Sequence, residues 1–376
     1  MFDLAELPES THALRAEVRA FLQKEISDGG FSPATNCWMI FDPEFSRRCG
    51  KSGYIGMTWP KLYGGREMSA LERFVMIEEM LAHGAPVGAH WVADRQSGQQ
   101  VLKFGHEVKK RELLPRIASG TCFFGIGMSE PDVGSDLASV RCRAEKVSGG
   151  WKINGTKIWT TFAHRVHYLI ALMRTAPVGE KRHEGLTQFL VDFSRPGVRR
   201  NPIRNLANDD DFCEVVFDDY IAEDVDVLGE VGRGWQLVTY ELAQERSGPE
   251  RFLSDFVLFL ELLQRARHEE AARKDVGRLV ARLFTLREMS ISIAGMLASG
   301  GTPELEAALV KDFGTQFERD LPEQARTIVT STSCLPSNDS FDVCLGRTIL
   351  YAPSFTLRGG TREVLRGIIA KYMGVR

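Results

Sequence analysis

The hydrophobic pattern changes its period twice along the chain, and this constrains the fold more than any other feature of the sequence. Up to about Ser119, apolar residues recur every three or four positions, which is the spacing of amphipathic helices. From about Thr121 to Asp226 the pattern instead alternates, as in half-buried strands. From Gly234 onward the helical spacing returns. We therefore expect an α+β fold in the order helical, β-rich, helical.

The length of 376 residues suits two or three packed units rather than one small core. The changes of period place the limits of three domains at residues 1–119, 120–227 and 228–376.

Within these zones, single segments predict elements. Residues 10–26, 69–84 and 107–120 indicate helices, the last interrupted at Pro115 because proline breaks helical hydrogen bonding. "WKINGTKIWTT" predicts a hairpin turning at Asn154-Gly155, the strongest two-residue turn signal. "HYLIALMRT", "LTQFLVDF" and "CEVVFDDYI" predict further strands.

Composition excludes several function classes. The formal net charge of −3, with acids and bases interspersed, gives no nucleic-acid tail and no membrane-binding stripe. No apolar stretch approaches the roughly 20 residues of a membrane span. Seven scattered cysteines without a CxxC pair argue against a zinc cluster or disulfide framework. We expect a cytoplasmic protein without a metal site.

Two stretches of the β zone could bind a ligand. In "GIGMSEPDVGSD", glycine backbone near Ser129 and Ser135 could approach a phosphate, although an ordinary loop explains it as well and it is not a Rossmann or P-loop motif. In "NGTKIWTT", Trp159 could stack on a planar cofactor and Thr161 could bond its edge; a packed strand is the alternative.

Two stretches of the last zone could carry chemistry. In "YELAQERSGPER", Pro249 removes the helical partner of the Glu245 carbonyl, so we expect a kink beside a carboxylate that apolar neighbours could perturb. A surface Glu245 paired with an arginine is an equal alternative. In "RGGTREV", Gly359 and Gly360 allow close backbone approach and Thr361 can cap the final helix, or the stretch is a simple turn.

Taken in order, these four stretches resemble the acyl-CoA dehydrogenase family, and the resemblance covers nearly the whole chain. It extends to "GYIGMTWPKLYGG", "KKRELLPRIASG" and "DYIAEDVDVLGEVGRGWQL". It implies an N-terminal helical domain, a middle β-barrel-like domain and a C-terminal four-helix bundle, with FAD as cofactor. It also implies that a carboxylate takes a proton alpha to the thioester while hydride passes from the beta carbon to flavin N5, giving a trans-2-enoyl-CoA.

The resemblance also implies the site residues. Cofactor contacts fall on Met128, Ser129, Gly134, Ser135, Trp159, Thr161, Thr361 and Glu363, and substrate contacts on Ser135 and Arg246. Most members carry the base in an "EGT" motif, which here reads "GGT" with Gly359 in place of the glutamate. Members similar to isovaleryl-CoA dehydrogenase carry it in a Glu-Arg pair on a bundle helix. Glu245-Arg246 matches that pair, so we expect Glu245 to be the base.

A second departure concerns assembly. Family homotetramers carry "RxxFG" and "GGxGY" motifs that embrace a neighbour's FAD, whereas the matching zones here read "GRLVARLFTLREMS" and "SCLPSNDSFDVCLG". We therefore expect an oligomer, as a heterotetramer with a sister subunit, similar to the paired bacterial subunits that desaturate steroid-derived CoA thioesters. An electron-transfer flavoprotein is the expected acceptor.

The sequence leaves three points open. A branched or steroid-derived acyl group fits the space that Gly359 and Gly360 leave, although neighbouring side chains could fill it. An acyl-CoA oxidase of the same fold would pass electrons to oxygen. A non-catalytic partner subunit would have lost its site, with Glu245 a bystander.

Overall fold

The computed structural model describes residues 2–3, 5–246, 248–329 and 337–375, and of residues 243–245 it describes the backbone alone. The chain divides into two compact units. The first, here the helical unit, comprises Met1–Phe41, Met68–Gly88 and Glu245–Arg376; the second, here the sheet unit, comprises Asp42–Glu67 and Ala89–Gln244. This division into two units does not test the three domains expected from the sequence, whose limits stay a prediction.

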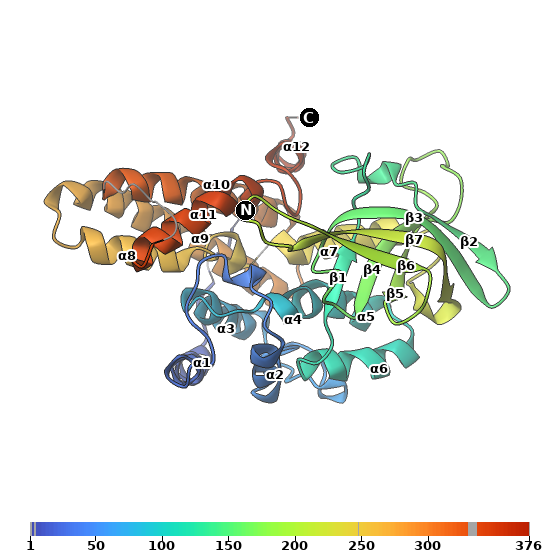
Figure 1. The fold of residues 1–376 in the computed structure, drawn as a ribbon, viewed down its shortest axis with the longest axis horizontal. Coiled ribbons are helices and arrows are strands. Elements are labelled where there is room, and N and C mark those ends of the chain that lie inside the picture. Colours follow the sequence, from blue (N-terminus) through green and yellow to red (C-terminus); the bar gives the residue numbers. More distant parts are fainter. Residues whose placement is uncertain (1, 4, 247, 330–336, 376) are drawn as a thin grey trace. The chain divides into compact units, whose positions relative to one another are not determined.

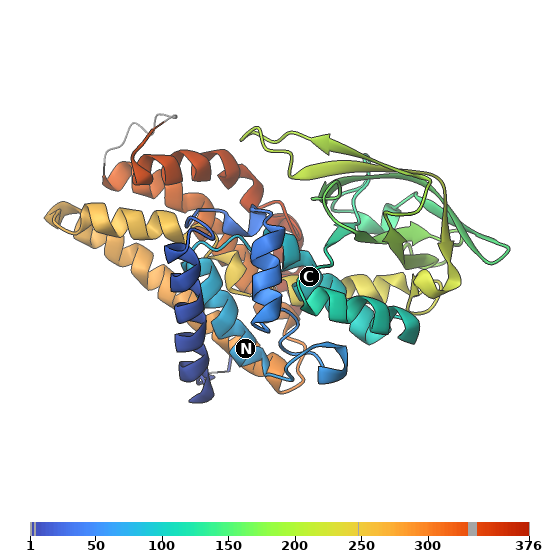
Figure 2. The same cartoon turned by 60° about the horizontal axis from the view of Figure 1, so that its bottom comes forward.

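The helical unit contains a bundle of four long helices. Helix α8 packs against α9 and α11, and α10 packs against the same two helices, so the four close a ring of contacts (Figures 1 and 2). Helix α3 adds to it by packing on α1 and α9, and α12 packs on α10. The elements of this unit are α1 Ser10–Ser27, η1 Cys37–Met39, α3 Ala70–Ala82, η6 Pro249–Arg251, α8 Phe256–Ala266, η7 Glu270–Ala272, α9 Arg273–Ala298, α10 Glu304–Ile328, α11 Ser340–Phe355 and α12 Arg362–Tyr372.

The N-terminal helices follow the apolar pattern. Leu14, Val18 and Leu22 form the buried face of α1 because they lie three to four residues apart. A capping box between Ser69 and Glu72 starts α3, in which the Ser69 side chain accepts from the Glu72 amide and the Glu72 carboxylate accepts from the Ser69 amide. In the described ranges, no helix combines the length with the apolar surface that a bilayer crossing requires.

The sheet unit is built on one eight-stranded sheet in the order β6-β7-β3-β2-β4-β5-β8, with β1 paired in parallel to β4 (Figure 1). Its strands are β1 Phe124–Gly127, β2 Arg143–Val147, β3 Gly150–Thr161, β4 Tyr168–Arg174, β5 Leu186–Asp192, β6 Val198–Ile203, β7 Phe212–Glu223 and β8 Val227–Leu228. Its helices are α2 Pro43–Lys51, η2 Lys61–Tyr63, α4 Gly88–Val92, the π-helical turn η3 Ala93–Ser97, α5 Gly98–Phe104, α6 Glu107–Ala118, η4 Leu137–Ser139, η5 Asp224–Asp226 and α7 Gly234–Arg246, whose last two residues belong to the helical unit.

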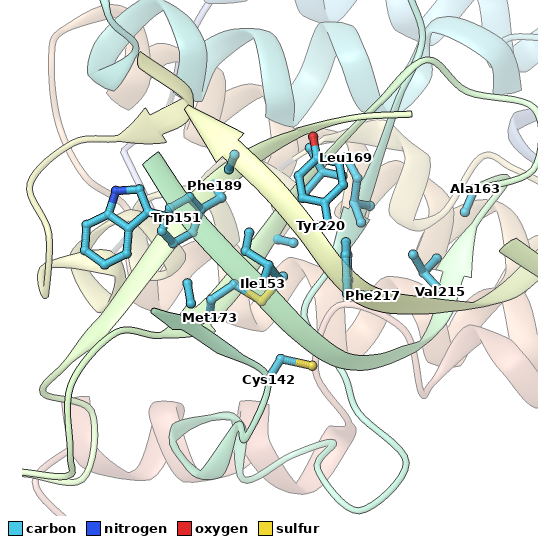
Figure 3. Packing of buried hydrophobic residues seen from close by; sticks show 14 of the residues in the cluster. Cys142, Trp151, Ile153, Ala163, Leu169, Met173, Phe189, Val215, Phe217 and Tyr220 are labelled. Carbon is cyan, nitrogen blue, oxygen red and sulfur yellow. The ribbon is translucent and has the colours of Figure 1, made fainter. Parts of the chain in front are cut away.

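The sheet encloses an apolar core (Figure 3). Strand β7 alternates inward and outward, so Cys213, Val215 and Phe217 all point into this core. Trp151 meets Phe189 edge to face, with ring centroids 5.6 Å apart. The Tyr220 hydroxyl accepts a hydrogen bond from the Asp192 amide at 2.8 Å, which satisfies the polar end of a buried ring.

The predicted hairpin at Asn154-Gly155 is wrong. Strand β3 runs straight through these residues with a register shift against β7, and the turn lies instead at Ser148-Gly149, between paired Val147 and Gly150. The Asn154 side chain makes two hydrogen bonds with Asp219 on β7. Its Nδ2 donates to Asp219 Oδ1 at 2.8 Å, and its Oδ1 accepts from the Asp219 backbone amide at 2.9 Å. Asparagine and glycine thus serve a β-bulge, a use of these residue types that local sequence does not distinguish from a turn.

Two proline predictions also need correction. Helix α6 continues through Pro115 to Ala118, because a proline in the last turn removes one hydrogen bond without preventing the packing of Leu113, Leu114 and Ile117. At Pro249 the chain does not kink within one helix: α7 ends at Arg246 and Pro249 begins η6. Residues 333–336 of "SCLPSNDSFDVCLG" lie outside the described residues.

Candidate functional site

The sheet unit brings four of the expected cofactor residues together. The segment after β1 lies against β3, where the Ser129 carbonyl accepts from the Ile158 amide at 3.0 Å and the Met128 carbonyl accepts from Lys157 Nζ at 3.1 Å. These bonds fix Met128 and Ser129 directly beside the part of β3 that carries Trp159 and Thr161. The Met128 side chain packs on an apolar cluster that includes Leu172, Leu186 and Val238.

A buried ion pair, which the sequence did not reveal, holds this segment in place. Lys157 Nζ lies 2.8 Å from Glu130 Oε1, and the lysine is completely shielded from solvent. The same carboxylate accepts from the amides of Arg141 at 2.7 Å and Cys142 at 2.9 Å. Burial by itself would raise the pKa of Glu130, but the charge of Lys157 and these hydrogen bonds outweigh it and hold the pKa below its ordinary value. Glu130 therefore stays an anion.

Trp159 has an unusual backbone for a strand residue. It lies at φ 60° in the register shift between Lys157 and Thr160, and its side chain is 57% exposed. A bulky residue in the left-handed region is strained, and such strain concentrates at functional sites. The indole meets Phe212 edge to face at 6.2 Å, which leaves its surface available.

The two residues that follow Trp159 both carry hydroxyls. Thr160 Oγ1 is buried and has no hydrogen-bond partner within the described part of the chain, and Thr161 is half-buried at the end of β3. An exposed indole, followed two residues later by a half-buried threonine, is a suitable surface for a planar, polar-edged ring.

Gly134 and Ser135, which the sequence also predicted as cofactor contacts, lie on an exposed loop and are not packed against β3 as Met128 and Ser129 are. A Cβ at Gly134 would meet no atom within 4 Å, and within the described residues no hydrogen bond involves the Ser135 side chain. Next to them, Asp136 accepts from Arg182 at 2.5 Å and from Ser139 at 2.7 Å.

An arginine-rich pocket of about 670 Å³ begins at this loop. Among the described residues its wall contains no carboxylate and consists of Ala138, Ser139, Val140, Arg141, Arg143, Arg174, Val178 and Arg182. Arg174 braces the wall by donating to the carbonyls of Ala138 at 2.8 Å and Glu184 at 2.9 Å. The exposed Arg143 side chain makes no hydrogen bond or ion pair within the described residues, so it is available to an anion. The pocket suits a phosphorylated ligand.

The helical unit contains the second group. Glu245 is the penultimate residue of α7, and its side chain lies outside the described part of the structure. Arg246 is buried, and its Nε donates to the Gly359 carbonyl at 3.3 Å. The end of α7 therefore contacts the glycine turn that precedes α12.

Thr361 is the N-cap of α12, as its sequence position suggests, and its Oγ1 accepts from the Val364 amide at 3.5 Å. Glu363 is exposed in the first turn, where its own backbone amide and the Thr361 hydroxyl hold the pKa of its carboxyl below the ordinary value. Gly359 and Gly360 both have left-handed backbones, at φ 68° and 99°. Residues 359–363 and Arg246 are thus brought together, while the roles assigned to them stay predictions.

Known protein families match nearly the whole chain. Three family models match: the acyl-CoA dehydrogenase N-terminal domain over residues 8–121, the middle domain over 125–220 and the C-terminal domain over 232–374. Among curated relatives, acyl-CoA dehydrogenase IpdE1 of Mycobacterium tuberculosis is 32% identical over 87% of this chain and 86% of its own. Mitochondrial isovaleryl-CoA dehydrogenase of Pongo abelii is 24% identical over 97% of this chain and 89% of its own.

Among solved structures, the Tcur3481-Tcur3483 steroid ACAD superposes with a TM-score of 0.87 at 26% identity, covering 100% of this chain and 99% of that one.

Proposed function

Since the chain belongs to the acyl-CoA dehydrogenase family, whose members are FAD-dependent oxidoreductases, we propose that it oxidises an acyl-CoA thioester between C2 and C3 with Glu245 as the base. The comparisons confirm three predictions from the sequence: the family, the fold with its helical, sheet and helical parts, and FAD as the cofactor. The general reaction is acyl-CoA dehydrogenation. The base, the substrate and the assembly are the proposals.

The residues of the sheet unit fit a flavin. An exposed, strained Trp159 and the half-buried Thr161 offer a ring surface and a hydrogen-bonding hydroxyl. The Lys157–Glu130 ion pair holds Met128 and Ser129 against β3, and so keeps them near Trp159 and Thr161. When bound, FAD accepts the hydride that leaves C3.

One contact carries the assignment of the base: Arg246 Nε binds the carbonyl of Gly359. Gly359 stands where most members have their glutamate, and it has no side chain to take a proton. The contact brings the end of α7, with Glu245 next to Arg246, to the backbone of that turn. Glu245 accordingly replaces the absent carboxylate and removes the C2 proton.

The arginine pocket supports a CoA thioester as the substrate. A CoA molecule carries several phosphates, and arginine is the side chain best suited to bind them in pairs of hydrogen bonds. The four arginines of the described lining provide that charge, although Arg141 and Arg182 are also paired with carboxylates outside the lining, Asp132 and Asp136. Arg143 would contact the phosphates directly, while Arg174 maintains the wall.

The acyl group is proposed to be branched or steroid-derived. Two neighbouring glycines at 359 and 360 leave the turn without side chains, and the Tcur3481-Tcur3483 protein is a steroid ACAD. That protein is also named for two polypeptides, which supports a sister subunit for this chain, as does the absence of "RxxFG" and "GGxGY" from its sequence. Electrons would pass to an electron-transfer flavoprotein.

The proposal is tested by anaerobic mixing of the FAD-loaded protein, with and without a co-expressed sister subunit, with a panel of straight, branched and steroid-derived acyl-CoAs. Flavin bleaching together with a product lighter by two hydrogens is expected for a steroid-derived or branched member. Bleaching by none of them, in either preparation, would contradict the function. Peroxide at one equivalent per turnover under air would identify an oxidase instead.

A further inference from the structure

The Gly359-Gly360 turn is held by two buried cations from two different helices. Lys311 of α10 donates from Nζ to the Gly360 carbonyl at 2.7 Å, and Arg246 of α7 donates from Nε to the Gly359 carbonyl at 3.3 Å. Lys311 is completely buried and Arg246 is 8% exposed. Burying a cation costs free energy unless the cation is bound. A buried lysine bound to a backbone carbonyl therefore indicates that this site requires a fixed turn, since general stability would not require a buried charge.

The residues on both sides of the turn are anchored as well. Before it, the guanidinium of Arg358 lies 3.8 Å from the ring centroid of Trp38 and 4.7 Å from that of Phe355. After it, Arg362 binds the buried Asp312 at 2.9 Å, and Asp312 is the neighbour of Lys311 on α10. The turn therefore has four cationic attachments in five residues of chain, counting the bonds to its two carbonyls.

Two glycines in succession need this support. Both residues lie in the left-handed region, where glycine has broad freedom, so the backbone alone does not select one conformation. Two successive carbonyls bound from different helices do select one, because rotating the peptide between them breaks at least one charge-assisted bond.

We propose that Lys311 is a positioning residue of the active site: with Arg246 it fixes the carbonyls of Gly359 and Gly360, and so sets the spacing between the end of α7, which carries the base, and the N-terminus of α12. The proposal rests on the proposed function, in which this turn borders the reacting carbons. Lys311 touches neither substrate nor cofactor in this role; it acts through the backbone it binds.

The test compares Lys311→Met, Lys311→Gln and Lys311→Arg in the FAD-loaded assembly. Hydrogen exchange of residues 357–366 is read by mass spectrometry, and kcat and KM are measured on the best acyl-CoA. Lys311→Met is expected to exchange about tenfold faster in this segment and to lose about tenfold or more in kcat with a much smaller change in KM. Lys311→Arg, which keeps a charged donor, should restore most of both, and Lys311→Gln, which keeps a neutral donor, should lie between.

Arg326→Met is the matched control. It removes an exposed cation from the same helix, where Arg326 pairs only locally with Glu323 in the described contacts, and it should change neither readout. Equal exchange in Lys311→Met and wild type, or no rescue by arginine, would overturn the proposal. If Lys311→Met does not fold, the glutamine and arginine variants decide it by the same two readouts.

The result separates this proposal from the assigned reaction. If the wild-type protein oxidises no acyl-CoA, the exchange measurement still reports whether Lys311 fixes the turn. Faster exchange with unchanged kcat would refute positioning and leave the dehydrogenase assignment intact.

Discussion

Lys157 and Glu130 form a buried ion pair, with Nζ and Oε1 2.8 Å apart, next to the residues expected to contact the flavin. The lysine also donates to the Met128 carbonyl at 3.1 Å. The pair therefore connects two stretches that the sequence marked separately, and it explains why they meet.

Lys157→Met should destabilise the protein by about 3–5 kcal/mol, because it leaves the Glu130 carboxylate buried without its cation. The double variant Lys157→Met/Glu130→Gln should recover part of this loss, since no charge is then left uncompensated. Chemical denaturation of both measures the effect. The control is Glu214→Gln on β7, a half-buried residue whose side chain accepts from Asn201 Nδ2, a bond that glutamine can keep. A single variant within about 1 kcal/mol of wild type would contradict the role given to the pair.

Arg143→Gln should raise KM for the acyl-CoA by about tenfold with little change in kcat, because a phosphate contact is equally strong in ground and transition states. The increase should shrink at high salt, where exposed charges are screened. Arg199→Gln on β6 removes an exposed arginine outside the pocket and should leave KM unchanged. An unaltered KM in Arg143→Gln would exclude the arginine pocket as the phosphate site.

Asp255 should make the stability of the protein depend on pH. Burial, reinforced by the neighbouring charge of Glu318 and opposed by Arg358, raises the pKa of Asp255 to about 8. One of its oxygens accepts from the Asn36 amide at 3.1 Å, while Oδ2 has no partner within the described residues. The folded protein therefore keeps a proton that the unfolded chain releases above its ordinary pKa of 3.8.

Since the folded state binds more protons between these two values, stability should fall as pH rises from about 4 to 8, by up to about 1.4 kcal/mol per pH unit. Asp255→Asn should reduce this slope, and the part that remains comes from the buried Glu318, whose pKa burial also raises. Asp275→Asn, at an exposed position on α9, should keep it. Denaturation midpoints measured at several pH values compare the two variants. If stability depends on pH in Asp255→Asn as strongly as in wild type, Asp255 is not a buried neutral carboxyl.

The helices and most strands follow from the spacing of apolar residues. Leu14, Val18 and Leu22 repeat at helical spacing, and Cys213, Val215 and Phe217 alternate, so each pattern fixes which face is buried. The changes of apolar spacing along the chain also predicted the order helical, β-rich, helical, and the family comparison confirmed it.

Local signals failed where distant residues decide the conformation. Asn154-Gly155 forms a bulge because Asp219, 65 residues away, bonds with Asn154. Lys157 and Glu130 lie 27 residues apart, and Lys311 and Gly360 lie 49 apart. A single lysine in a helix or strand gives no sign of such a partner. The stretches "GIGMSEPDVGSD" and "NGTKIWTT" marked the region but not the ion pair that supports it.

The most direct test of the central claim is the rate constant of anaerobic flavin reduction in Glu245→Gln, measured by rapid mixing with the best acyl-CoA and compared with wild type at equal FAD content. Loss of a general base predicts a rate constant lower by about 10²–10⁴-fold, with FAD retained. Reduction at the wild-type rate by a fully loaded Glu245→Gln protein would show that another group removes the proton.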